Sequence, residues 1–584
     1  MLRTKKQYNS IPFEQELSRA SMAVKKRALD AVKNEKFAVV QTHSNQQQER
    51  ISSLLNSSSS KSKANASFCL PYFLLLMTII TFTGLLLEHM IVGGTSGHQI
   101  MDNTLDEIKI LEKSADTFVH SALNKLRKGD LKKDAEQEQT VKNNQGNQKG
   151  KQRDESIAPL LTADGTLLHM VFSTDCSSYQ HWQAYLMFHS AMEVNQPGYV
   201  TRIASGCSKE EAKIAKEWHE KHITKPMSNR FIIHFTPHFS SVKDKDGNTK
   251  GDYKFFNKPF GVLHWMENGI DRKGSMADAI VILIDPDMLL LRPVTHDFSD
   301  ERDTIINKNR ILRPDDPPTL RKVKHGYPFA QIYGFGNQWK TKLDLKKVTS
   351  DDNSPALKVS QSEASKFYPV GPPYLATVSD MYKIAVRWVE FVPEVHKQYP
   401  HLLAEMFAFC VAAAHLKLPH QLIDSLMISN VGAGTGGGEG WALVDAIPEK
   451  EGTKDFCTIA MGPPTSSMGL SPTSPSSPIS VPSVVHFCQR YFIGHWFFGK
   501  RRMPKNFFTC ESALLAEPPG DIVSTVDFGQ APGGDVKKMN LKVRKRYGFS
   551  VCSLIGAVNR AGEFFKKKTC SSTEMNMQKT LKLM

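Results

Sequence analysis

The chain has 584 residues, 40% of them hydrophobic, and a formal net charge of +15. A chain of this length can hold more than one domain and bury a sizeable core. Its lysines and arginines gather in the N-terminal region, near residues 125–153 and after residue 530, without a zinc finger, an RRM-type aromatic motif or a helical basic region. The charge is therefore assigned to solvated segments, and nucleic acid is not an expected partner.

The first predicted element is an uncharged apolar segment at residues 67–87. As a helix rising about 1.5 Å per residue it reaches roughly 30 Å, the hydrocarbon thickness of a bilayer. Residues 1–66 are rich in Lys and Arg, whereas acidic residues follow Leu87 before the first lysine, Lys109. The positive-inside rule then predicts a cytosolic tail over 1–66 and a lumenal remainder. We expect a single-pass type II protein of the Golgi or ER membrane.

Composition divides the lumenal part. Residues 88–159 are polar and poor in aromatic residues, which predicts a solvated stem. A compact domain is expected over 160–530, interrupted by a flexible Ser/Pro-rich loop at 463–483, and 531–584 is interpreted as a basic C-terminal tail.

Eight of the nine cysteines follow the apolar segment, on the side where disulfides persist. Connectivity does not follow from sequence. Proximity along the chain suggests Cys176 with Cys207 and Cys488 with Cys510, and Cys410 lies in an apolar helical pattern typical of a buried thiol.

Within the domain, short apolar runs alternate with helical patterns. This alternation predicts an α/β domain with a mostly parallel sheet and helices on both faces. Ligands bind such sheets at the carboxyl ends of the strands. The predicted strands are 167–172, 200–205, 230–235 and 278–285, and the predicted helices are 178–194, 208–222 and 258–268.

Two aspartates, Asp285 and Asp287, interrupt the oily stretch AIVILIDPDMLLLRP at 279–293. An unpaired carboxylate taken out of water costs several kcal/mol, so both need a partner. Two carboxylates one residue apart suit a hard divalent cation such as Mn²⁺ or Mg²⁺, and the alternative is a solvated Asp-Pro turn. Without a cation the two charges would repel, so Asp287→Asn is expected to leave the stability of the metal-free domain nearly unchanged, or to raise it.

Four segments, in order, resemble one enzyme family: VFSTDCSSYQHWQA, FFNKPFGVLHWM, VILIDPDM and LLAEMFAFCVAAAHLKLPH. They are similar to the plant and algal peptidyl serine α-galactosyltransferases and to the hydroxyproline O-arabinosyltransferases. The resemblance covers roughly 165–430, with a further piece at 484–496. It implies a GT-A-like fold, a UDP-sugar donor, a D-x-D motif that holds a metal–diphosphate complex, and retention of anomeric configuration.

Three residues form the predicted metal site. Asp287 is the first choice for a direct ligand, and Asp285 is assigned to the metal, to a water on it or to the donor's ribose. His486 follows the apolar VPSVV, and the resemblance implies that a late histidine completes the metal shell. The alternative for His486 is a structural histidine at a strand end.

Other residues are assigned to the substrates. Asp175 ends the first strand and is placed for uridine or ribose. Lys258 begins a helix, where it either neutralises phosphate or is a solvated surface residue. Glu405 interrupts an apolar helix, so it is either a catalytic or positioning group facing acceptor hydroxyls or the partner of a buried arginine such as Arg387.

The sequence therefore predicts a metal-dependent glycosyltransferase that moves galactose or arabinofuranose from a UDP-sugar to serine or hydroxyproline of hydroxyproline-rich glycoproteins. The alternative is an inactive membrane-anchored lectin-like or scaffold protein of the same fold. Four aromatic residues are candidate platforms on which a sugar or a polyproline acceptor could stack. These are Trp339, Tyr374, Tyr491 and Trp496.

Overall fold

The computed structural model describes residues 160–243, 249–300, 302–309, 316–433, 438–447, 456–463 and 481–583. All belong to one compact unit, Gln152–Met584. The predicted cytosolic tail (1–66), transmembrane segment (67–87) and stem (88–159) lie outside the described residues, as does most of the predicted loop at 463–483. Among the helices described, none combines the length and apolarity needed to cross a bilayer.

A seven-stranded sheet, in the order β10-β8-β9-β6-β1-β2-β3, forms the centre of this unit. β1 pairs in parallel with β2 and β6, β2 with β3, and β8 with β10, whereas β9 runs antiparallel to both β6 and β8. The prediction of a mostly parallel sheet is confirmed. The strands are β1 (Leu168–Asp175), β2 (Tyr199–Ser205), β3 (Phe231–Thr236), β6 (Ile280–Ile284), β8 (Phe329–Ile332), β9 (Val370–Thr377) and β10 (Gln421–Ile423).

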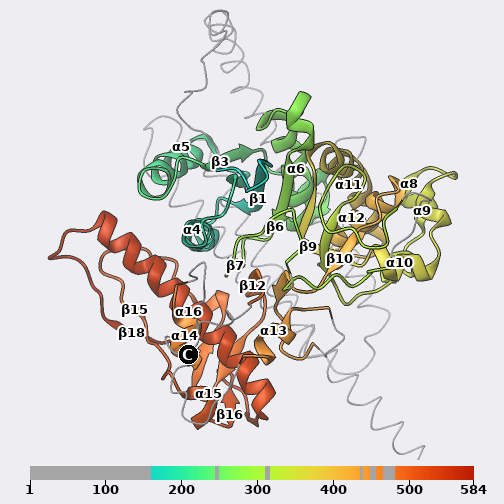
Figure 1. Ribbon diagram of the computed structural model, residues 1–584. Coiled ribbons are helices and arrows are strands. Elements are labelled where there is room, and N and C mark those ends of the chain that lie inside the picture. Colours follow the sequence, from blue (N-terminus) through green and yellow to red (C-terminus); the bar gives the residue numbers. More distant parts are fainter. Residues whose placement is uncertain are drawn as a thin grey trace, which may run out of the picture. The chain divides into compact units, whose positions relative to one another are not determined.

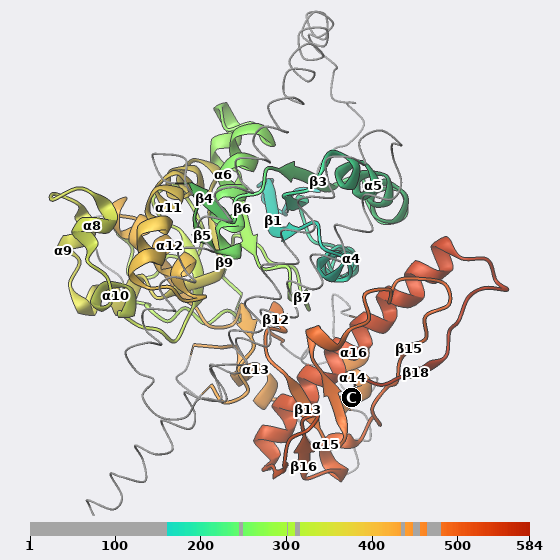
Figure 2. The same ribbon diagram turned by 180° about the vertical axis from the view of Figure 1, so that it is seen from behind.

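Helices cover both faces of the sheet, as the alternating pattern predicts (Figures 1 and 2). Every residue of β6 is buried: Ile282 packs in the core shared with α4, and Leu283 in the core shared with α6, α11 and α12. A parallel strand buried on both sides reads as a continuous apolar run for this reason. The helices are α4 (Ser178–Glu193), α5 (Lys209–His219), α6 (Asn257–Asn268), α11 (Val378–Gln398) and α12 (Ala404–His415).

A smaller three-stranded sheet, in the order β11-β12-β7, adjoins the end of β6. Its strands are β7 (Met288–Leu290), β11 (Met427–Ile428) and β12 (Val484–His486). β12 pairs antiparallel with β7, with His486 opposite Met288. This pairing brings a late part of the chain to the loop that follows β6.

The prediction that 531–584 is a basic tail is wrong. Residues Leu541–Thr569 form the long helix α16, whose central part is buried against α4, α13 and α14. Two of its lysines are buried because they bind backbone carbonyls: Lys545 Nζ donates to Ile447 O at 2.6 Å, and Lys566 Nζ to Thr509 O at 2.6 Å. The basic residues at both ends of α16 concealed an apolar middle, and the folded domain extends through residue 583.

Disulfides hold α16 in place. Cys457 on α14 is bonded to Cys552 on α16, and Cys510 is bonded to Cys570 at the end of α16. The suggested bond between Cys488 and Cys510 is therefore wrong, and Cys488 is a free, exposed thiol. Proximity in sequence did not predict the correct partner of Cys510, because the end of α16 brings Cys570 next to Cys510 in the folded chain.

The two other cysteine predictions are confirmed. Cys176, just after β1, is bonded to Cys207, just after β2, so the bond joins the ends of two neighbouring strands. Cys410 on α12 is a free, fully buried thiol.

The remaining elements are short, and several of them, including α14, α15 and β13, pack on α16. They are β4 (Ser241–Lys243), β5 (Thr249–Asp252), α7 (Gln338–Thr341), α8 (Leu345–Thr349), α9 (Pro355–Lys358), α10 (Gln361–Phe367), α13 (Trp441–Asp445), α14 (Phe456–Met461), α15 (Ile522–Thr525), β13 (Tyr491–Ile493), β14 (Trp496–Phe498), β15 (Leu514–Leu515), β16 (Phe528–Gln530), β17 (Val536–Lys538) and β18 (Lys579–Leu581), with a π-helical turn at Glu220–Thr224 and 3₁₀ turns at Lys254–Phe256, Gly274–Asp278 and Lys500–Arg502.

Candidate active site

The loop between β6 and β7 carries the two aspartates out of the central sheet. Asp285 follows the last residue of β6, and Asp287 precedes the first residue of β7. Asp287 is only 7% exposed, and the side chain of Asp285 is 22% exposed. Because β6 ends here beside β1, the loop lies at the edge of the sheet that forms the carboxyl ends of parallel strands.

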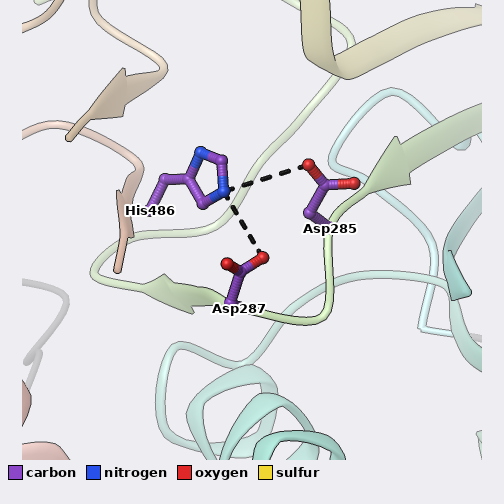
Figure 3. Close-up of side chains that lie close together, drawn as sticks. All are labelled: Asp285, Asp287 and His486. Atoms are coloured by element: carbon purple, nitrogen blue, oxygen red, sulfur yellow. Dashed lines mark ion pairs between the residues drawn. The ribbon is translucent and has the colours of Figure 1, made fainter. Parts of the chain in front are cut away.

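His486 completes a cluster with these aspartates (Figure 3). Its Nε2 lies 3.3 Å from Oδ1 of Asp287 and 3.9 Å from Oδ2 of Asp285. The potential ligand atoms of the three side chains all lie within 4.8 Å of one another. The β7–β12 pairing creates this cluster, because it fixes the end of β12 opposite the start of β7.

Two lysines neutralise the aspartates. Nζ of Lys258, in the first turn of α6, lies 2.8 Å from Oδ1 of Asp285. Lys500, in the 3₁₀ turn after β14, forms an ion pair with Oδ2 of Asp287. These contacts explain how two carboxylates persist in an apolar loop. The sequence placed Lys258 at this edge but did not identify Lys500, whose run Lys-Arg-Arg is typical of a solvated turn.

The same lysine reaches Glu405. Nζ of Lys258 lies 3.1 Å from Oε1 of Glu405 in the first turn of α12. The partner of Glu405 is therefore Lys258, whereas Arg387, the arginine considered from sequence, pairs with Glu390 on the exposed face of α11. Oε2 of Glu405 is buried and accepts no hydrogen bond from any described residue. A buried carboxylate oxygen of this kind is available to a substrate hydroxyl.

The protonation of the cluster follows from burial and charge. Burial raises the pKa of Glu405 to about 7, against the opposing charge of Lys258. Burial also disfavours the charged form of Asp287, but His486 and Lys500 outweigh it and hold the pKa of this carboxyl well below its usual range. Lys258 keeps its proton because Asp285 and Glu405 raise its pKa despite burial.

Asp175 occupies the same edge of the sheet but is not part of the cluster in the described structure. It ends β1, where its Oδ1 accepts hydrogen bonds from the backbone N of Ser177 at 2.8 Å and from the hydroxyl of Ser177. β1 is the direct neighbour of β6, with Phe172 paired to Ile284. The ends of the two strands thus lie side by side, and the role of Asp175 stays a prediction.

Most of the aromatic residues considered as acceptor platforms belong to the core. Trp339, Tyr374 and Tyr491 are fully buried. Tyr491 instead supports the cluster, because its hydroxyl lies 2.9 Å from the carbonyl oxygens of both Ser429 and His486. Only Trp496 is partly exposed, and it lines an apolar cavity of about 230 Å³ in the C-terminal region.

The donor set of the cluster fits a divalent cation. Two ligand atoms that are both about 2.1 Å from an ion lie at most about 4.2 Å apart, and the distances from Nε2 of His486 to Asp287 and Asp285 are 3.3 and 3.9 Å. Two carboxylates and an imidazole are ligands that Mn²⁺ accepts. The side chain of Asp285 is partly exposed to solvent.

Comparisons with known proteins agree with the family expected from the motifs. No family model matches the chain. It is 25% identical over 275 residues to the peptidyl serine alpha-galactosyltransferase of Arabidopsis thaliana, a match covering 45% of this chain and 27% of that protein. It is 29% identical over 132 residues to the protein of the same name from Chlamydomonas reinhardtii, covering 22% and 15%.

A solved structure also matches. It is the crystal structure of the galactosyltransferase LgtC in complex with donor and acceptor sugar analogues, 12% identical with a TM-score of 0.26, covering 55% of this chain and 87% of that one. The matches to the two curated relatives span about a quarter or less of those proteins' length. Over the matched region the chain is similar to peptidyl serine α-galactosyltransferases, as its motifs predict.

Proposed function

We propose that the chain is a GT-A-like glycosyltransferase that transfers galactose or arabinofuranose from a UDP-sugar to serine or hydroxyproline of hydroxyproline-rich glycoproteins. The observation that carries the proposal is the convergence of Asp285, Asp287 and His486 at the ligand-binding edge of the sheet. The similarity to two peptidyl serine α-galactosyltransferases supports the reaction class.

Each side chain of the site receives a role. Asp285, Asp287 and His486 hold Mn²⁺ or Mg²⁺, which when bound stabilises the charge of the departing diphosphate. Lys258 adds positive charge beside the phosphates, and Asp175 receives the ribose or uracil. Glu405 positions a hydroxyl through Oε2, which is buried and accepts no hydrogen bond from the described residues. Retention of configuration requires no dedicated base, so Glu405 acts as a positioning group.

A donor and acceptor screen tests the reaction. The purified chain is incubated with Mn²⁺, with each of several UDP-sugars, and with either an oligo-hydroxyproline or a Ser-Hyp peptide. Mass spectrometry should show a gain of one hexose or one pentose on a peptide, and chelation of the metal with EDTA should abolish that gain. A chain that modifies neither peptide with any donor contradicts the proposed transfer.

The alternative function is a lectin-like or scaffold protein that has kept the fold without turnover. Hydrolysis of the UDP-sugar in the absence of acceptor discriminates between the two. A transferase releases UDP slowly in a Mn²⁺-dependent reaction, whereas a binding protein retains the sugar nucleotide intact or ignores it. Loss of UDP release in Asp287→Asn would tie the hydrolysis to the cluster.

The proposed location is the lumen of the Golgi or ER, behind a type II anchor at 67–87. Three disulfides in the described domain support an oxidising compartment. Protease added to sealed microsomes should remove only about the first 66 residues, and detergent should then expose the domain. Digestion of the domain in intact microsomes contradicts this topology.

A further inference from the structure

The two aspartates use their oxygens in the same way. Asp285 directs Oδ1 to Lys258 and Oδ2 towards His486. Asp287 directs Oδ2 to Lys500 and Oδ1 to Nε2 of His486. The three atoms that face one another form the cation site, and each lysine occupies the outer oxygen of one aspartate.

The site is therefore neutralised before a cation arrives. Two carboxylates carry two negative charges, Lys258 and Lys500 carry two positive charges at direct contact distance, and His486 beside Asp287 adds to the positive side. Glu405 shares Lys258 and is itself buried. A dication that enters a site without net negative charge gains little from attraction, and it is repelled by the buried ammonium group of Lys258 and the half-buried one of Lys500.

We infer that Lys258 and Lys500 make the binding of a divalent cation conditional on the diphosphate of the donor, so that the metal and the nucleotide bind together. The inference rests on the proposed metal-dependent function. A diphosphate adds at least two negative charges, offers oxygen ligands to the ion, and gives both lysines an anionic partner. By linkage, the metal must strengthen nucleotide binding by the same factor as the nucleotide strengthens metal binding.

Lys500 is the residue to change. It contacts Asp287 from the 3₁₀ turn after β14, and its side chain is 25% exposed. Lys258 also holds Glu405, so its removal would leave a second buried carboxylate without its partner. Lys500→Met keeps most of the unbranched side chain and removes the charge, whereas Lys500→Arg keeps the charge.

The experiment measures Mn²⁺ binding to the purified full chain by the loss of the free-ion EPR signal, with and without UDP. In the wild type, UDP should tighten Mn²⁺ binding by about a hundredfold. Lys500→Met should bind Mn²⁺ alone at least about tenfold more tightly than wild type, because Asp287 is no longer neutralised. The coupling factor between Mn²⁺ and UDP should fall accordingly. Lys500→Arg and the exposed control Lys505→Met should behave as wild type.

Each other outcome is decisive. A wild-type chain that binds Mn²⁺ equally well with and without UDP overturns the inference and leaves the metal site standing. Unchanged affinity for Mn²⁺ alone in Lys500→Met also overturns it. Thermal melting verifies that this variant is folded, and Lys500→Gln removes the same charge with a different side chain. A wild-type chain that binds no Mn²⁺ even with UDP removes the proposed metal site and the inference together.

Discussion

At Asp287, one carboxylate has two cationic partners, and this determines what its removal does. Asp287→Asn should abolish sugar transfer and metal-dependent UDP binding, because asparagine replaces a carboxylate ligand poorly. It should also lower the stability of the metal-free domain by about 1–3 kcal/mol, because Lys500 and His486 lose their charged partner. Thermal or denaturant unfolding without metal measures the second effect, and the transfer assay measures the first.

The sequence alone gives the opposite expectation for stability, since it places two unpaired carboxylates side by side. The structure reverses that expectation, because Asp287 is paired with Lys500, which lies more than two hundred residues away in sequence and meets it only in the folded chain. Asp297→Asn is a suitable control: Asp297 pairs with Lys322 at 2.9 Å on the surface, where the loss should stay below about 1 kcal/mol. Full activity in Asp287→Asn would end the metal-site interpretation.

Glu405 should make stability depend on pH. Its pKa is raised by burial from an ordinary 4.5 to about 7 in the folded chain, so the folded state binds the proton more tightly than the unfolded state. Its contribution to stability is complete below about pH 4.5 and is lost as pH rises through 7. Melting temperatures of the metal-free protein between pH 5 and 8 should therefore fall less steeply in Glu405→Gln than in wild type.

Glu390→Gln is the control for that slope, because Glu390 is an exposed acid on the neighbouring helix α11. It should leave the pH dependence of the melting temperature as it is in wild type. If Glu405→Gln also has the wild-type slope, Glu405 is charged throughout this pH range, and the proton that we assign to it at neutral pH is absent.

The candidate site could be predicted where the chemistry is local. The two aspartates can be identified because carboxylates are rare in apolar segments, and His486 can be identified because it ends an apolar strand. Lys500 and the pairing of Lys258 with Glu405 carry no such local signal, since a lysine in a basic turn and a lysine at a helix start are ordinary surface residues. Their partners are set by the tertiary fold alone.

At the scale of elements, the reactivity of the cysteines tests how α12 and α16 are packed. In the native protein, iodoacetamide should modify Cys488, which is exposed, and spare Cys410, which is buried on α12. Peptide mapping without reduction should recover three bonded pairs. Cys410 should react only after unfolding, and its rapid labelling in the native state would contradict the packing of α12. The expected pairs are Cys176–Cys207, Cys457–Cys552 and Cys510–Cys570.

Truncation tests whether α16 is part of the domain. A chain that ends at residue 530 loses Cys552 and Cys570 and exposes the surfaces of α4 and α14 that α16 covers. We expect it to be insoluble or to lack a cooperative thermal transition. Deletion of the Ser/Pro-rich residues 464–480 is the companion variant and should shift the melting temperature by only a few degrees, because loop closure depends weakly on length. A soluble, cooperatively folded truncation would restore the tail interpretation.

For the whole molecule, the first half of the described fold was predictable and the second half was not. β1, β2, β3 and β6 are short apolar runs separated by helical patterns, with β1, β2 and β3 side by side in chain order and β6 on the other side of β1. After β9, the strands have only two or three residues, and some of them pair across long separations, as β12 does with β7. Elements this short carry too few residues to show a period, so their pairing depends on tertiary packing.

The pairing of β7 with β12 also determines when, during synthesis, the candidate metal site can form. Asp285 and Asp287 leave the ribosome about 200 residues before His486 and Lys500, an interval of roughly 10–40 seconds at about 5–20 residues per second. Through that interval Asp287 has neither of its folded-state cationic partners, so an apolar loop with an uncompensated charge must stay hydrated. Strands β1, β2, β3 and β6 can pair early in synthesis, but the chain completes the candidate metal site only near the end of translation.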